Sequence, residues 1–141
     1  MEDYLAVALA RARQMGFGPR AAGEIAQLRA TDFLADLRRA ETTRLTELAV
    51  FAPVDDHAWI DGVIDLVVHD PAARLVRVID WKTNRLRPGE TGEALLARLC
   101  EEYRPQLEAY GTCAGGFFPG CAVRLELYAS AAGAARVLGP T

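Results

Sequence analysis

The sequence predicts an α/β domain in which a mixed β-sheet is flanked by helices. Apolar residues recur at helical spacing up to about residue 39, follow strand patterns between residues 43 and 82, and return to helical spacing from residue 91. A further alternating segment follows at 122–129. The resulting order of helices, strand, hairpin, helix and strand is typical of a mixed sheet covered by helices.

Length and composition favour one globular domain. The chain has 141 residues, of which 51% are hydrophobic and 25% are charged. We therefore expect a single domain over 1–141, with a helical amino-terminal part (1–42) and a core of sheet and helix (43–141). No apolar run approaches the ~20 residues that cross a bilayer. Because the amino terminus also lacks a secretory pattern, we expect a cytoplasmic protein without membrane contact.

The amino-terminal part is expected to form two or three helices that cover one side of the domain. Their apolar spacing places them within Glu2–Met15 and Pro19–Arg39. Thr31 followed by Asp32 is typical of a helix cap, and it predicts a short helix over Asp32–Ala40.

Strand patterns follow in four segments. They are Thr43–Pro53, Ala58–His69, Leu75–Lys82 and Ala122–Ala129, with a weak partner for the last near 136–138. The intervening 70–73 (DPAA) suits a tight turn, so the second and third strands should form a hairpin. The segment Thr91–Gly111 is helical in pattern, and Pro105 must either kink that helix or begin a second one.

Two carboxylates lie inside apolar strands. Asp65 occurs in GVIDLVV and Asp80 in LVRVIDWK, where an uncompensated charge is costly. A tight hairpin pairs residues whose numbers sum to about 143 or 145, which brings Asp65 opposite Val78 or Asp80. Neighbouring carboxylates repel unless a proton or cation lies between them, and Mg²⁺, or Mn²⁺ in its place, suits oxygen ligands.

Lys82 points to the same face of its strand as Asp80 and is the only lysine among sixteen basic residues. An ammonium beside a metal and a water is a role that arginine cannot fill. With Asp65, and with the backbone carbonyl of Trp81 as a further metal ligand, this set suits metal-assisted phosphodiester hydrolysis. On spacing alone, the same residues could equally form a buried or edge salt-bridge network.

A net charge of −3 gives no global attraction to nucleic acid, so DNA contacts must come from local groups. Tyr103, Gln106 and Tyr110 share one helix stripe that suits phosphate and nucleotide contacts, although tyrosines half buried in the core would give the same stripe. A polar and basic rim near Lys82 offers further contacts with a DNA backbone. The rim residues are Thr83, Asn84, Arg85, Arg87 and Arg104.

Three motifs occur in order: GVID at 62–65, IDWKTNR at 79–85 and YRPQLEAY at 103–110. Together they resemble the nuclease domain of RecB and AddA helicase-nucleases, which belongs to the PD-(D/E)xK superfamily, over about 43–128. The resemblance implies a restriction-endonuclease-like fold. It also implies catalytic roles for five residues. These are Asp65, Asp80, Lys82, Gln106 and Tyr110.

The resemblance further implies a divalent-metal-dependent DNA exonuclease of the exodeoxyribonuclease V type, acting in recombinational double-strand break repair. Such domains end longer polypeptides that begin with a UvrD-like helicase, which uses ATP, and they work beside an AddB-like or RecC-like subunit. No phosphate-gripping GxxxxGK[ST] loop occurs here, so this is expected to be the nuclease piece of a larger protein. Glu47 in TELAVF resembles the family's early strand.

The chain also departs from the family. A histidine metal ligand usually precedes the first strand, and no histidine precedes His57 here. The three cysteines lack the spacing of a disulfide framework, a zinc site or an AddB-type iron-sulfur cluster. Two alternatives therefore stay open: a catalytically silent DNA-binding or scaffolding domain of the same fold, and a plain interaction domain in which the charged residues form salt bridges.

Overall fold

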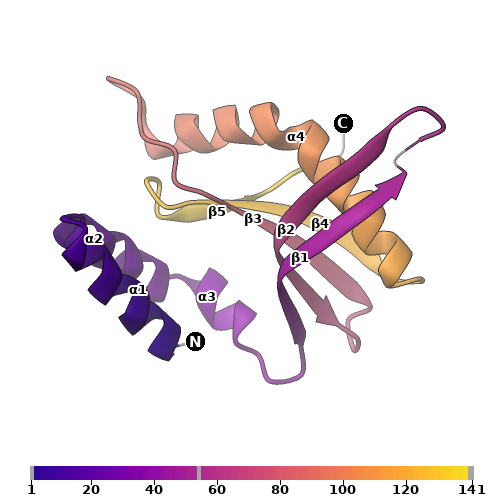
Figure 1. The fold of residues 1–141 in the computed structure, drawn as a ribbon, viewed down its shortest axis with the longest axis horizontal. Helices are drawn as coiled ribbons and strands as arrows, with labels where there is room; N and C mark the ends of the chain where they lie inside the picture. Colours follow the sequence, from indigo (N-terminus) through magenta and orange to yellow (C-terminus); the bar gives the residue numbers. More distant parts are fainter. Residues whose placement is uncertain (1, 54, 140–141) are drawn as a thin grey trace.

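The strand-forming segments assemble into one mixed sheet, seen in a computed structural model that describes residues 2–53 and 55–139. The sheet order is β1-β2-β3-β4-β5, with β3 and β4 parallel and the other neighbours antiparallel. The strands are β1 (Thr43–Pro53), β2 (Trp59–Asp70), β3 (Leu75–Lys82), β4 (Ala122–Ala129) and β5 (Ala134–Val137). The helices are α1 (Glu2–Gln14), α2 (Gly18–Arg29), α3 (Asp32–Leu37) and α4 (Gly92–Phe117). The predicted α/β fold with helices flanking a mixed sheet is confirmed (Figure 1).

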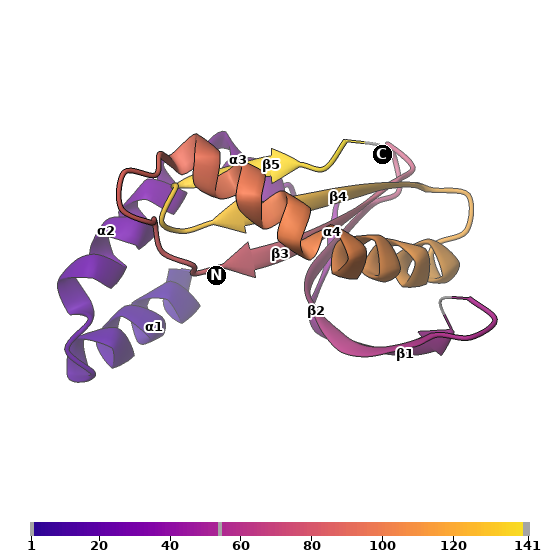
Figure 2. The same cartoon turned by 90° about the horizontal axis from the view of Figure 1, so that it is seen from above.

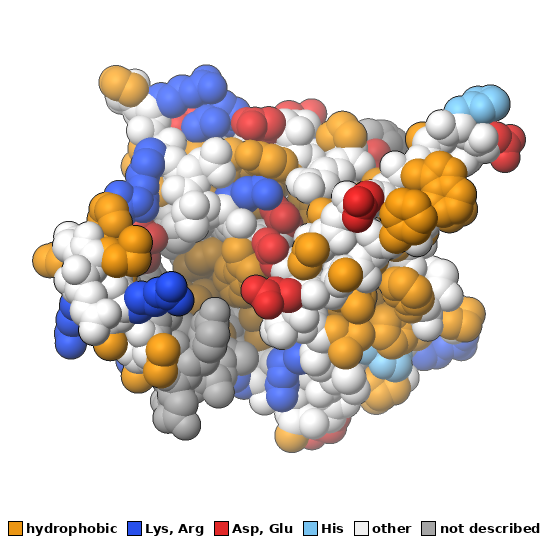
Figure 3. Space-filling model, in the orientation of Figure 1, with side chains coloured by type: hydrophobic (Ala, Val, Ile, Leu, Met, Phe, Trp, Pro, Cys, Tyr) orange, Lys and Arg blue, Asp and Glu red, His pale blue; other side chains and the backbone are white. Residues whose placement is uncertain are grey.

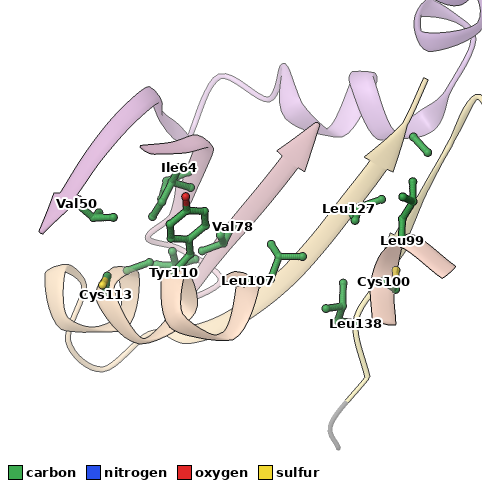
Figure 4. Packing of buried hydrophobic residues seen from close by; sticks show 14 of the residues in the cluster. Val50, Ile64, Val78, Leu99, Cys100, Leu107, Tyr110, Cys113, Leu127 and Leu138 are labelled. Atoms are coloured by element: carbon green, nitrogen blue, oxygen red, sulfur yellow. The ribbon is translucent and has the colours of Figure 1, made fainter. Parts of the chain in front are cut away.

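Helix α4 covers one face of the sheet as a single helix with Pro105 inside it. Proline lacks an amide hydrogen and crowds the preceding turn, and α4 changes direction near its middle in Figure 2. The predicted kink is therefore the correct alternative, because one helix continues through the proline. The bend lets the two halves of α4 pack on different strands. Figure 4 shows Leu99 beside Leu127, and Tyr110 between Ile64 and Val78.

Helix α3 lies against the opposite face of the sheet. The Thr31 hydroxyl accepts a hydrogen bond from the Leu34 amide, which confirms the predicted cap. The helix ends at Leu37, earlier than the predicted Ala40. Arg44 donates from Nη1 to the Leu37 carbonyl oxygen at 2.8 Å, so this carbonyl has a partner without a further helical turn.

A buried ion network ties α3 to the sheet. Arg77 on β3 is 5% exposed and forms a bidentate contact with Glu126 on β4 at 2.7 and 2.8 Å. Arg77 also binds Asp36 on α3, and Arg124 donates to Glu126 at 2.7 Å. Two guanidinium groups therefore face two carboxylates, and the network is electrically neutral.

Helices α1 and α2 pack on each other and lie beside the sheet, as Figures 1 and 2 show. The expected covering of one side of the domain therefore comes from α3, while α1 and α2 form an arm. This arm meets the segment after β3 through an ion pair between Glu24 and Arg85, with an Nη1 to Oε1 distance of 2.6 Å. Among the described residues, no helix combines the length and hydropathy needed to cross a membrane.

Strand β2 changes face at Asp65. Ile64 is buried on the α4 side and Leu66 on the α3 side, although residues two apart in a regular strand point the same way. Opposite this point, Glu47 has a φ of 51° and drops out of the β1–β2 pairing. Such an irregularity re-aims a side chain, as β-bulges do, and here it releases Asp65 from the regular alternation.

Candidate active site

The β2–β3 register decides which residues meet. The pairing runs from Asp70 with Leu75 to Leu66 with Ile79, so paired numbers sum to 145. This is one of the two predicted registers, and it continues toward Asp65 and Asp80 as the next opposing residues. The hydrogen-bonded ladder ends one step before them, where β1 and β2 run on together as a two-stranded ribbon (Figure 1).

Asp65 caps the open end of this ladder. Its Oδ2 accepts a hydrogen bond from the Trp81 amide at 2.8 Å. A side-chain carboxylate thereby takes the place of the backbone carbonyl that a continuing ladder would offer. The contact fixes one oxygen of Asp65 beside Trp81, the residue of β3 that lies between Asp80 and Lys82 in the chain.

Asp80 and Lys82 lie on the α4-facing side of β3. Val76 and Val78 before them are fully buried on that side, and the alternation continues through both charged residues. Lys82 Nζ is 2.6 Å from Asp80 Oδ2, and the two side chains are 16% and 6% exposed. Among the described residues, the Lys82 ammonium is the one cationic group in close contact with Asp80 Oδ2. The second carboxylate, Asp65, also lies beside Asp80.

The electrostatics of Asp80 reflect this incomplete pairing. Burial raises the pKa of its carboxyl above the ordinary value, and the charge of Asp65 raises it further, while Lys82 opposes both. Two carboxylates and one ammonium leave one negative charge uncompensated. Figure 3 shows acidic side chains gathered beside a hollow between the α1–α2 arm and the sheet.

Gln106 and Tyr110 contact each other on α4, and Tyr110 also contacts β2. Tyr110 is 4% exposed, and Gln106 Nε2 donates to its hydroxyl at 3.2 Å. A methyl group added at Gly62 would lie 2.7 Å from the Tyr110 hydroxyl oxygen, so only glycine allows this approach. Tyr110 therefore packs α4 onto β2 three residues before Asp65. No role was predicted for Gly62 beyond its place in the GVID motif, although a glycine inside a strand often marks such a close approach.

The remaining predicted residues divide into two groups. Tyr103 is half-buried and its ring centroid lies 3.8 Å from Lys82 Nζ, which brings it directly to the site. Thr83, Asn84, Arg85 and Arg87 follow β3, although Arg85 is paired with Glu24. Arg104 is not brought into this group. Its Nη1 donates to the Gly139 carbonyl at 3.0 Å and its guanidinium also faces Glu101 and Glu108, because its side chain leaves α4 on another side from Tyr103.

The donor set fits a divalent cation in part. Asp65 and Asp80 offer hard oxygen ligands, and Asp80 Oδ2 already faces one cation, the Lys82 ammonium. Across 2–53 and 55–139, no group of three or more His, Cys, Asp or Glu side chains is arranged to hold a metal ion. A metal ion at this place would find two side-chain carboxylates, and backbone oxygen or water would have to complete its coordination.

Residues 1–133 match a family model described as the PD-(D/E)XK nuclease superfamily. No curated protein matches the chain.

Proposed function

The chain belongs to the PD-(D/E)XK nuclease superfamily, and on this premise we propose that it is a divalent-metal-dependent deoxyribonuclease with Asp65, Asp80 and Lys82 at its active site. One observation carries the proposal. Asp80 is buried beside a second carboxylate, Asp65, and beside the sole lysine, so one ammonium faces two carboxylates. A structural salt bridge needs one carboxylate for one ammonium, and the second carboxylate adds a negative charge that a divalent cation would balance.

Asp65 and Asp80 would hold Mg²⁺ or Mn²⁺, with the backbone carbonyl of Trp81 as a further oxygen ligand. When bound, the ion would polarise a phosphoryl oxygen and lower the pKa of a water molecule. Members of this superfamily typically use divalent metals. The negative charge that Lys82 leaves uncompensated supports this assignment.

The protein groups prepare the site in distinct ways. The Trp81 amide fixes the direction of Asp65, and Tyr110 on Gly62 holds the part of β2 that carries it. Lys82 places a compact positive charge beside Asp80, where it would orient the attacking water and stabilise negative charge on the phosphate.

We propose that DNA contacts come from the segment after β3, with Gln106 exposed nearby on α4. The segment that follows Lys82 at the carboxyl end of β3 carries Thr83, Asn84, Arg85 and Arg87. Amide, hydroxyl and guanidinium groups bind phosphates and fix the position of a strand. Arg85 would exchange its exposed contact with Glu24 for a phosphate, a substitution of one anion for another.

The finer biology rests on the three motifs shared with RecB and AddA nuclease domains. We propose an exonuclease of the exodeoxyribonuclease V type that serves recombinational double-strand break repair. The single domain would be one part of a helicase-nuclease whose helicase domains consume ATP, with an AddB-like or RecC-like subunit as partner. One observation favours the rival of a silent DNA-binding domain, namely that two carboxylates are few ligands for a metal.

Cleavage of linear single-stranded DNA tests the proposal directly. The protein is assayed with Mg²⁺, with Mn²⁺ and with EDTA, alongside Asp65→Asn and Lys82→Ala. Asp61→Asn is the matched control, because it makes the same change on an exposed position of the same strand. We expect metal-dependent cleavage in the wild type and the control, and a loss of at least ~10²-fold in the two site variants.

Two results would contradict the proposal. Cleavage that persists in EDTA or in Lys82→Ala would place the activity elsewhere. DNA binding without cleavage, both here and in a polypeptide extended at its amino terminus, would instead establish the silent DNA-binding domain.

A further inference from the structure

Tyr103 faces Lys82 in a way that direct DNA contact does not require. Its ring centroid lies 3.8 Å from Lys82 Nζ, with the ammonium over the ring face. This is well within the ~6 Å over which a cation is attracted by the negative face of an aromatic ring. The side chain of Lys82 is 16% exposed, so water weakens the attraction less than at an open surface.

The position of the ring is set by the core rather than by the lysine. Tyr103 packs against the hydrophobic cluster between α4 and the sheet, which includes Leu107 and Ile64. It lies two residues before Pro105, at the bend between the two halves of α4. A lysine side chain has four flexible bonds, whereas a packed aromatic ring has a fixed direction. The rigid group therefore positions the flexible one.

We propose that Tyr103 is a positioning residue for Lys82, holding its ammonium over the ring face beside Asp80. The ammonium now lies between two anchors, the Asp80 carboxylate and the Tyr103 ring. A cation that takes up Asp80 Oδ2 competes with Lys82 for that oxygen. The ring then remains as the anchor that keeps the ammonium at the site.

The structural half of this inference is independent of activity, while its kinetic half rests on the proposed nuclease function. Because Lys82 is the only lysine, protein grown with ¹³C-labelled lysine gives one Cε–Hε signal in an NMR spectrum. Aromatic ring currents shield protons above the ring face. We expect the Lys82 Hε signal upfield of its position in an unstructured lysine peptide.

Two substitutions separate the ring from the hydroxyl. In Tyr103→Phe the ring remains, and the upfield position of the Lys82 signal should be retained. In Tyr103→Leu the core contact is kept in apolar form but the ring is lost, and the signal should return to the peptide position. A Lys82 signal at the peptide position in the wild type itself overturns the inference, whether or not the Leu variant folds.

Kinetics then tests the consequence for catalysis. Tyr103→Leu should lower kcat by about tenfold, with Tyr103→Phe close to wild type. Affinity for fluorescent single-stranded DNA in EDTA should be unchanged in both variants. A loss of DNA affinity with normal kcat would show that Tyr103 contacts DNA directly and would overturn the positioning role. If all variants keep their NMR behaviour but none cleaves DNA, the nuclease proposal fails while the Lys82–Tyr103 contact stands.

Discussion

Strand β3 carries two buried charged groups that face opposite sides of the sheet. Arg77 faces α3 and Asp80 faces the α4 side, and each residue is 5% exposed. Arg77 has carboxylate partners on both Glu126 and Asp36, with charge-assisted hydrogen bonds throughout. Asp80 has one ammonium and a second carboxylate as neighbours.

The difference separates a structural from a functional use of buried charge. A neutral, fully hydrogen-bonded network such as that of Arg77 can offset the cost of desolvation. The group around Asp80 cannot, because its two carboxylates share one ammonium and a negative charge remains. Burial of a charge is common to both places, and only the completeness of its partners distinguishes them.

Removal of a charge from the Arg77 network should give the largest effect. Glu126→Gln removes the buried charge opposite Arg77 and should lower the free energy of unfolding by about 3 kcal/mol, because the guanidinium keeps only the more exposed Asp36 as an ion partner. Urea denaturation measures this loss. Glu102→Gln is the matched control, since Glu102 is half exposed and pairs weakly with Arg98, and it should change stability by less than ~0.5 kcal/mol. Equal effects in both variants would mean that the Arg77 network is not structural.

Added metal should stabilise the protein only through the group of charged residues around Asp80. At Mg²⁺ concentrations about tenfold above Kd, we expect about 1.4 kcal/mol of stabilisation and a rise in Tm of roughly 5 °C. Asp80→Asn should abolish this rise, and Glu126→Gln should retain it. Thermal melts with Mg²⁺ and with EDTA measure the effect, and an equal rise in both variants would remove metal binding from Asp80.

Without metal, neutralising Asp80 should not destabilise the protein. Asp80→Asn removes a carboxylate that is repelled by Asp65 and poorly solvated, so we expect the free energy of unfolding at pH 7 to stay equal or rise by about 1 kcal/mol. Cleavage should be lost in the same variant. A drop in stability like that of Glu126→Gln would make Asp80 a second structural charge.

The pH dependence of that stability gain has a definite sign. Burial and Asp65 raise the pKa of Asp80 above its ordinary 3.8, so the fold favours the protonated carboxyl. The protonated Asp80 carboxyl therefore contributes to the free energy of unfolding of the wild type below about pH 3.8, and this contribution is lost as pH rises through the folded-state pKa. Asp80→Asn cannot ionise and keeps a constant contribution. The stability difference between variant and wild type should widen over that range in EDTA. Denaturation curves at several pH values would refute this if the difference stayed constant.

Local patterns in the sequence were enough to predict most helices and strands and the charged residues of the candidate site. Strand alternation placed Leu75–Lys82 and Ala122–Ala129 at their observed bounds. It also put Asp80 and Lys82 on one face, because alternation with period two depends only on nearest neighbours in the chain. The Thr31 cap and the proline kink were predicted for the same reason, since both act within one helical turn.

Contacts between distant segments were left to the tertiary structure. Two registers remained open for the hairpin, and nothing in the local pattern indicated that β2 changes face at Asp65. Three contacts join residues that are far apart in the chain. They are the packing of Tyr110 on Gly62, the contact of Lys82 with the Tyr103 ring, and the Arg77–Glu126 ion pair.

The sequence by itself therefore determined which groups are present and that Asp80 and Lys82 share one face of their strand. The tertiary structure decided which of them are satisfied. The physical reason is that the cost of a buried charge depends on the number and alignment of its partners, and those partners come from other strands and helices.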